Sequence, residues 1–411
     1  MGPLVVSKNF IHRFFIVVAL LIAGYFLIHY IFIGITTKPT EGDSLSYHIP
    51  IAKDILAGHI LGPNTKPGNF MMYPASGETL LAGFIKIGIP LNFYNVAAII
   101  VLFFTFLYIG KVFQFKLWYS VLFATAFSTL YGVLRWIPTQ KIDLWLLSYF
   151  LLSFALLNKP KNNIWYFTIL GILSGLVLGS KYSAPGLLLV LFIFYFKSFF
   201  KYCNWKRIIV FLVMTILFGG FWYIRNFLVT GDPLYPQPFL FFHGDGNGYL
   251  QLQIWKSLLV MPKDFVNMFV SEYMVWSLLL LIMPVFLLVT ILKKNFWKYY
   301  FINKIILLGL VNLFLYLFFP GGTIYTNLVH GVRYTFPTMS FLMLSIFILA
   351  KYFKKEELLG WIVIVNISYL FLPFSYHPKL LFLYVSVTTL IFGIFQKYFS
   401  FFSRFIHNNS R

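Results

Sequence analysis

Two acidic side chains lie at the ends of apolar segments of this 411-residue chain. Asp43 follows the first long apolar segment, and Asp143 opens a later one in PTQKID. A carboxylate at the boundary of a membrane-type segment is costly unless it is hydrated or paired. We therefore predict that both take part in catalysis, with Asp43 as a base or orienting group for a hydroxyl. The alternatives are a helix cap for Asp43 and a surface pair of Asp143 with Lys141 or Arg135.

Three cations occupy similar positions, at the ends of other apolar segments. They are Lys181 in GSKYSAPG, Arg225 in WYIRNFL and Arg333 in RYTFP. The glycines and proline around Lys181 indicate backbone that lines a cavity, and a fixed arginine suits an anionic headgroup. We predict that these cations bind a phosphate. For Lys181 the alternative is a side chain that extends along the apolar segment to the membrane surface.

Four further side chains are candidates to line the same site: Tyr47, His48, Glu78 and His330. Tyr47 lies one helical turn from Asp43, and Glu78 falls in the first turn of an expected helix, where the helix dipole alone would favour a carboxylate. A metal cluster could be formed by Asp43, His48, His59 and Glu78, but their spacing matches no compact ligand motif. A divalent metal is therefore left open.

The elements that must position these residues are apolar helices. The chain is 60% hydrophobic and 10% charged, far outside the soluble globular range, and indicates an all-α polytopic membrane protein. About 12 transmembrane helices are expected, several of them shorter than the roughly 20 residues of an ordinary span. They centre on residues 14–35, 94–110, 117–134, 142–157, 164–180, 183–196, 208–224, 273–292, 305–319, 336–350, 359–372 and 378–396.

The distribution of charge predicts the topology. The formal net charge is +21. If the N-terminus is cytoplasmic, most of the 32 Lys and Arg lie inside and most of the 11 acidic residues outside. This pattern explains the positive charge by topology and contacts with anionic lipids, without nucleic acid as a partner. We expect the site on the extracytoplasmic face.

A single transmembrane domain is expected over residues 1–411, with no separate soluble domain. Two long extracytoplasmic loops stand out, at 36–93 and 225–272. The first should hold two short interfacial helices. One is the amphipathic segment 41–58, which an internal proline kinks or restarts, and the other begins near residue 76.

A series of motifs carries a resemblance to a known superfamily. In order, they are DSLSYHIP (43–50), YPASGE (73–78), PTQKID (138–143), GSKYSAPG (179–186), WYIRNFLVTGDPLYP (222–236) and RYTFP (333–337). The series resembles the bacterial polytopic glycosyltransferases of the GT-C superfamily, nearest to the branch related to aminoarabinose and protein-mannosyl transferases.

The resemblance implies a GT-C-like fold and an inverting glycosyltransferase of the bacterial inner membrane. The donor would be a sugar on undecaprenyl or dolichyl phosphate, and the acceptor a cell-surface glycan, lipid or protein. No other cofactor is implied with certainty.

The resemblance also implies residue roles. The acidic residue at the catalytic centre of the family falls on Asp43, and that at the start of the fourth span on Asp143. Lys181 takes the place of the lysine in the TK-type motif, after Ser180 instead of threonine, and Arg225 that of the arginine in WY-x-RN. We expect no counterpart of the soluble C-terminal domain that several members have.

Two other functions fit the same pattern. A lipid-linked oligosaccharide flippase or transporter would also have many spans around a polar cavity, but its ionisable residues should lie near mid-membrane in repeated halves. In this chain they gather at one face. A polysaccharide polymerase or ligase shares the lipid-phosphate chemistry and stays open.

Overall fold

The computed structural model describes residues 8–62, 68–237, 242–244, 254–318 and 331–368. His330 and the expected span 378–396 lie outside them. The larger helices are α1 (Lys8–Thr36), α4 (Phe93–Val112), α5 (Leu117–Ser128), α6 (Tyr131–Leu134), α7 (Asp143–Asn158), α8 (Ile164–Leu178), α9 (Ala184–Phe194), α10 (Phe196–Phe200), α11 (Trp205–Thr215), α12 (Phe221–Thr230), α13 (Ile254–Val260), α14 (Pro262–Tyr273), α15 (Leu279–Leu292), α16 (Tyr300–Phe318), α18 (Phe336–Tyr352) and α19 (Glu356–Ser368). Short π- or 3-10-helical turns are η1 (Ser44–His48), η2 (Gly68–Met72), η3 (Ile216–Gly220), η4 (Met274–Leu278) and η5 (Gly331–Thr335).

Helices occupy the described part of every expected span up to 359–372, so the all-helical, polytopic fold is confirmed for the residues that the structure describes. Within the described ranges, 6 helical stretches are long and apolar enough to cross a membrane, while α5, α7, α8 and α9 are apolar but shorter. The total of about 12 spans stays a prediction.

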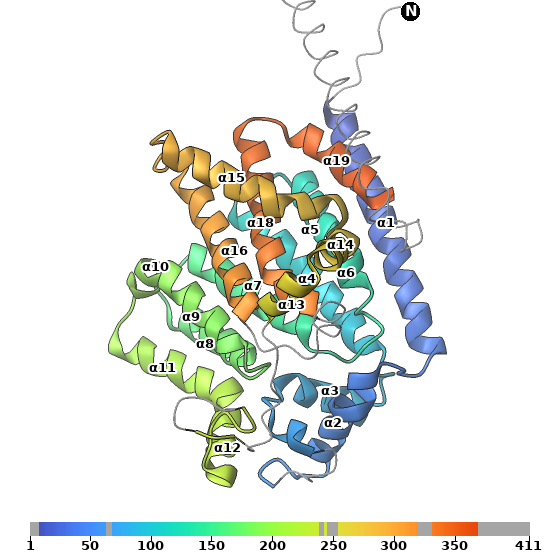
Figure 1. Cartoon of the computed structure of the whole chain (residues 1–411), viewed down its shortest axis with the longest axis vertical. Coiled ribbons are helices and arrows are strands. Elements are labelled where there is room, and N and C mark those ends of the chain that lie inside the picture. The colour runs from blue at the N-terminus through green and yellow to red at the C-terminus, as the bar shows by residue number, and fades with distance from the viewer. Residues whose placement is uncertain (1–7, 63–67, 238–241, 245–253, 319–330, 369–411) are drawn as a thin grey trace, which may run out of the picture.

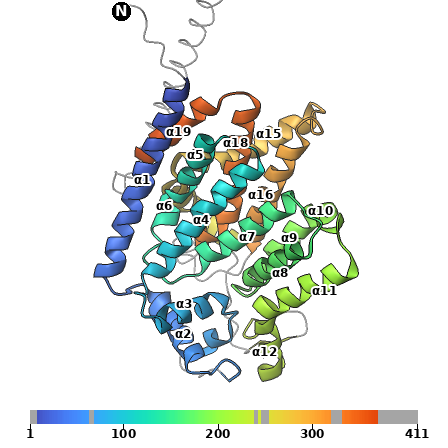
Figure 2. The ribbon, with the colours of Figure 1, turned by 180° about the vertical axis from the view of Figure 1, so that it is seen from behind.

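The centre of the bundle is formed by α4, α5, α7, α16 and α18. In the most apolar part of the span that includes α18, 83% of the residues are buried, against 6% in that of α1, which lies along one side against α4 and α5 (Figures 1 and 2). Since both helices are strongly apolar, α1 has the character of a helix that faces lipid.

Glycines bring α8 and α11 close together on the opposite side of the bundle. Gly171 and Gly175 are four residues apart on α8, and a Cβ at either position would lie 2.6 and 2.8 Å from backbone carbonyl oxygens of Phe211 and Thr215. Gly219 in η3 faces Gly175 in the same way. This small-residue contact is how membrane helices approach without large side chains between them.

We expect Gly219→Ala to destabilise this contact by about 1–3 kcal/mol, because the new methyl group would overlap the Gly175 carbonyl. The matched control is Gly220→Ala, whose Cβ would meet its nearest neighbour, Ile216, at an ordinary 3.4 Å. Thermal unfolding of the two variants in detergent checks the prediction, and equal unfolding temperatures would contradict it.

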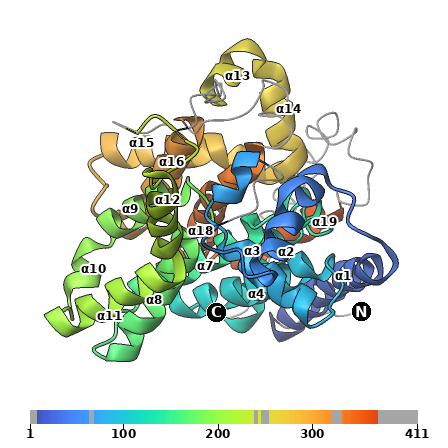
Figure 3. The ribbon, with the colours of Figure 1, turned by 90° about the horizontal axis from the view of Figure 1, so that it is seen from below.

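The first long loop contains the two expected short helices, α2 (Ile49–Leu56) and α3 (Ser76–Lys86). The segment before α2 differs from the expected regular helix, since η1 is a π-helical turn and Pro50 lies in the first turn of α2. Helical backbone is nevertheless continuous from residue 42 through η1 into α2, so Pro50 does not restart the helix. Figures 1, 2 and 3 place α2 and α3 at the end of the bundle where α1 finishes.

The segment 225–272 contains more helix than its description as a loop suggests. Helix α12 continues to Thr230 and ends at Gly231, whose φ of 76° suits glycine. Helices α13 and α14 follow, and α14 leads through η4 into the apolar helix α15, which ends at Leu292. The position of the range on the extracytoplasmic side stays a prediction.

Candidate active site

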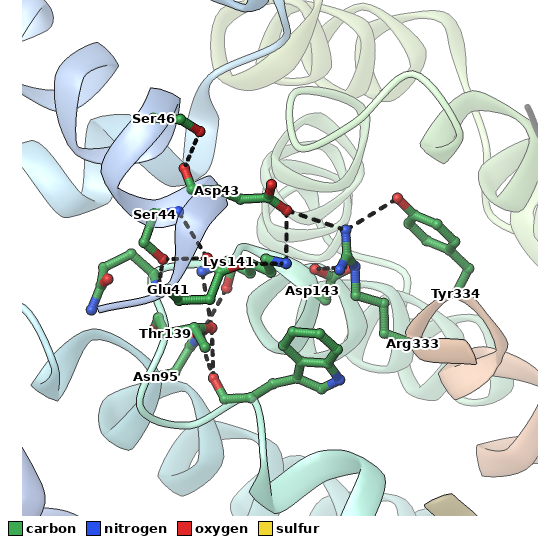
Figure 4. A network of polar contacts seen from close by, with 12 residues as sticks. Glu41, Asp43, Ser44, Ser46, Asn95, Thr139, Lys141, Asp143, Arg333 and Tyr334 are labelled. Carbon is green, nitrogen blue, oxygen red and sulfur yellow. Dashed lines mark hydrogen bonds and ion pairs between the residues drawn. The ribbon is translucent and has the colours of Figure 1, made fainter. Parts of the chain in front are cut away.

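The ends of four helical segments meet at one site, at the end of the bundle where α2 and α3 lie (Figures 1 and 2). Asp43 follows α1, Lys141 and Asp143 lie at the start of α7, Lys181 joins α8 to α9, and Arg333 lies in η5 before α18. Figure 4 shows Asp43, Lys141, Asp143 and Arg333 gathered in one place. The structure therefore brings together both predicted carboxylates and two of the predicted cations.

Lys141 holds Asp43. Its Nζ lies 2.7 Å from Asp43 Oδ2 and 2.9 Å from Glu41 Oε1, and its side chain is only 1% exposed. The backbone N–H and the hydroxyl of Ser44 both donate to Glu41 Oε2 at 2.8 Å. Glu41 thus caps the turn, while Asp43 makes no cap hydrogen bond. The alternative of a capping role for Asp43 is wrong.

Asp143 is paired on both of its oxygens. Lys181 Nζ lies 2.6 Å from Oδ1 and Arg333 Nε lies 3.3 Å from Oδ2. Arg333 Nη2 also lies 4.0 Å from Asp43 Oδ2, so it connects the two carboxylates. The alternatives of a surface pair with Lys141 or Arg135 and of an extended, lipid-surface Lys181 are wrong.

These six side chains form a charge cluster: Glu41, Asp43, Lys141, Asp143, Lys181 and Arg333. Aromatic rings extend it. Lys141 Nζ and the Arg333 guanidinium lie 4.5 and 5.1 Å from the ring centroid of Trp136. Lys181 Nζ lies 4.7 Å from that of Tyr334. The negative ring faces stabilise cations that are shielded from water.

The carboxyl groups of Asp43 and Glu41 are held ionised. Burial raises the pKa of Asp43, but the charge and hydrogen bond of Lys141, with Arg333, outweigh burial and bring the pKa below its ordinary value. Burial also raises the pKa of Glu41, but Lys141 and the hydrogen bond from Ser44 outweigh burial and lower it. The Asp43 side chain is 41% exposed. It is an accessible carboxylate whose basicity depends on Lys141.

This pairing predicts a pH dependence of stability. Because the pKa values of Asp43 and Glu41 are lowered on folding, the stability they contribute is present above their unfolded values and is lost as the pH falls through the folded ones. In Lys141→Met the carboxyl groups of Asp43 and Glu41 stay partly buried but lose the cation that lowers their pKa values. We therefore expect its unfolding temperature to fall less than that of the wild type between about pH 6 and about pH 3. Lys53→Met, at an exposed lysine of α2, should follow the wild type.

Arg225 lies outside the charge cluster, in a second buried position. It is 3% exposed, stacks on Trp222 at 4.9 Å, and donates from Nε and Nη2 to Asn226 Oδ1 at 3.0 and 2.8 Å. Among the described residues no carboxylate pairs with it. Asn226 Nδ2 donates to the Tyr182 hydroxyl at 2.8 Å, and Tyr182 follows Lys181. One shared contact therefore connects Arg225 to the charge cluster.

His48 and Glu78 pair with each other. Their Nδ1 and Oε1 atoms are 2.5 Å apart and both side chains are buried, so the pair fastens η1 to α3. Tyr47 stacks on Phe70 at 5.0 Å, and burial raises the pKa of its hydroxyl well above the usual value. In the part of the chain that the structure describes, no group of three or more His, Cys, Asp or Glu could hold a metal.

No protein-family model and no curated protein sequence matches this chain. Its structure is similar to the crystal structure of ArnT from Cupriavidus metallidurans bound to undecaprenyl phosphate, with a TM-score of 0.56 and 11% sequence identity. The likeness covers 90% of this chain and 69% of that chain. This chain has the ArnT fold. The resemblance predicted from the motifs is thereby confirmed for the fold.

Within this ArnT fold, four residues at the charge cluster were not among the predicted site residues: Glu41, Lys141, Trp136 and Tyr334. A signal was present for the first two, because Glu41-x-Asp43 and Lys141-x-Asp143 repeat the same spacing of charges. Nothing in the sequence indicates the rings, because aromatic residues are frequent at every membrane interface.

Proposed function

We propose that this protein is a glycosyltransferase that moves a sugar from a polyprenyl-phosphate donor to a hydroxyl acceptor at the membrane surface. The observation that carries the proposal is the charge cluster, which lies at the end of apolar helices and presents an accessible carboxylate beside buried cations. ArnT, whose fold the chain shares, is bound to undecaprenyl phosphate in its crystal structure. Such a donor has an apolar chain for the lipid and a phosphate for the cations.

In this proposal Lys181, Arg225 and Arg333 bind the donor phosphate. Arg225 is the strongest candidate, because it is buried and pairs with no carboxylate among the described residues. A buried charge without a partner costs several kcal/mol, and a bound anion offsets that cost. Lys181 and Arg333 are already paired with Asp143, which holds them in place.

The reaction is then an inverting displacement at the anomeric carbon. Asp43 accepts the proton of the acceptor hydroxyl while the oxygen of that hydroxyl forms the new bond to the anomeric carbon of the sugar. The bond from the sugar to the phosphate breaks, and its electron pair stays on the phosphate, where the cations stabilise the charge. Lys141 keeps Asp43 ionised before the reaction.

The site lies on the extracytoplasmic side of the bacterial inner membrane in this proposal. That assignment follows from the excess of Lys and Arg in the opposite loops. The acceptor is a glycan, a lipid or a protein with a free hydroxyl.

A reconstitution assay tests the proposal. Purified protein in liposomes receives undecaprenyl-phosphate sugars together with hydroxyl acceptors, and release of undecaprenyl phosphate is followed by mass spectrometry. We expect release that depends on the acceptor. Translocation of an intact lipid-linked sugar across the bilayer without cleavage would overturn the proposal in favour of a flippase.

A further inference from the structure

Two consecutive residues at the end of α14 hold the chain segments on either side of the charge cluster. Glu272 Oε1 lies 2.7 Å from Arg135 Nη2, and the glutamate is 1% exposed. The hydroxyl of Tyr273, which is 0% exposed, donates to the Val332 carbonyl at 3.2 Å and lies 2.6 Å from Thr335 Oγ1. Neither Glu272 nor Tyr273 is itself part of the charge cluster.

Both segments supply cluster residues. Arg135 stacks on Trp136 at 4.4 Å, and Lys141 and Arg333 lie near the same ring at 4.5 and 5.1 Å. Trp136 is therefore a shared surface for three cations, one of which is fastened by Glu272. Tyr273 contacts the turn η5 on both sides of Arg333, at Val332 and at Thr335. A displacement of α14 would move the ring and the guanidinium together.

The fold tolerates backbone strain at this point. Met274, directly after Tyr273, has a φ of 54° and is 1% exposed, although buried side-chain residues rarely adopt a positive φ. The neighbouring helix α6 makes room with Gly132, where a Cβ would lie 2.6 Å from Glu272 Oε2. The strained backbone at Met274 and the space left by Gly132 both lie at the end of α14. They indicate that the fold requires Glu272 and Tyr273 in these positions.

We infer that Glu272 and Tyr273 form a positioning clip, through which α14 sets the placement of Arg333 and Trp136 and thereby the affinity for a polyprenyl phosphate. The inference rests on the proposed function, because it names the residues that keep its phosphate-binding cations in place. The clip touches no reacting atom. Its effect must therefore pass through Arg333, which Tyr273 holds by way of η5 and Glu272 by way of Arg135 and Trp136.

The test uses Tyr273→Phe, which removes one hydroxyl, and Tyr119→Phe as its matched control. Tyr119 is 1% exposed and donates to the Phe347 carbonyl of α18 at 2.8 Å, outside the charge cluster. The probe is undecaprenyl phosphate, titrated into protein in nanodiscs. We expect Tyr273→Phe to weaken its Kd by about tenfold, Tyr119→Phe to leave it within about twofold, and both to lose similar thermal stability.

A double-variant cycle separates positioning from general destabilisation. If the clip acts through Arg333, adding Tyr273→Phe to Arg333→Ala should weaken binding no further. Glu272→Gln, which keeps the shape of the side chain and removes its charge, should show the same dependence on Arg333. Unchanged affinity of Tyr273→Phe, or an equal loss in both backgrounds, would overturn the clip while the proposed function stands. A wild type that does not bind undecaprenyl phosphate would overturn both.

Discussion

Asp43→Asn is expected to lower the turnover of sugar transfer by about 100-fold or more while the KM for the donor changes little. An amide is nearly the same shape as the carboxylate but does not accept a proton at working pH. Glu41 caps the turn at Ser44, so the substitution removes no cap. Steady-state kcat and KM of the purified variant, with undecaprenyl-phosphate sugar as donor, check this expectation.

Two further variants sharpen that experiment. Asp43→Glu should recover only part of the turnover, because the longer side chain misplaces the carboxylate. Asp54→Asn is the matched control, since Asp54 lies on α2 and pairs with His59 at 2.9 Å, apart from the charge cluster. Near-normal kcat in Asp43→Asn would contradict the role of Asp43 as the base.

Arg225→Ala is expected to raise the KM for the donor by about 10- to 100-fold with a smaller effect on kcat. A charge-assisted contact to phosphate contributes about 1.5–3 kcal/mol, and Arg225 is already positioned by Asn226 and Trp222. Donor titrations at saturating acceptor measure the change.

The control for Arg225 is a cation in a similar setting at another end of the bundle. Lys351 Nζ donates to the carbonyl groups of Phe113 and Gln114 at 3.0 and 2.7 Å and lies 5.7 Å from the Phe115 ring. Lys351→Ala should leave the donor KM unchanged. The same KM for Arg225→Ala and the wild type would remove Arg225 from the phosphate site.

Residue type and place along the chain were enough to predict Asp43, Asp143, Lys181 and Arg333 as members of one site, because charges at the ends of apolar segments meet at one membrane face. Their partners could not be predicted in this way. Asn95 of α4 donates to the carbonyl groups of Trp136, Thr139 and Lys141 and shapes the turn before α7. That long-range contact accompanies a turn in which Lys141 pairs with Asp43 and not with its neighbour Asp143.

The contacts that the end of α14 makes near the charge cluster could not be predicted for a different reason. The apolar span was expected to begin at residue 273, so Glu272 fell at the end of a presumed loop and Tyr273 at the start of the span. The helix in fact begins at Pro262, a residue type that favours the first turn, followed by the acidic Asp264. Those local signals were present, but the strained junction at Met274 and the gap at Gly132 depend on tertiary packing.

The equal numbers of carboxylates and cations in the charge cluster bear on product release. The donor is a phosphodiester with about one negative charge, which Arg225 alone can match. The leaving polyprenyl phosphate is a monoester that carries about two charges once its second proton is lost, near pH 6. The site thus holds the product best while the proton taken from the acceptor stays within it. Inhibition by undecaprenyl phosphate should therefore weaken as the pH rises, and turnover at alkaline pH should be less limited by product departure.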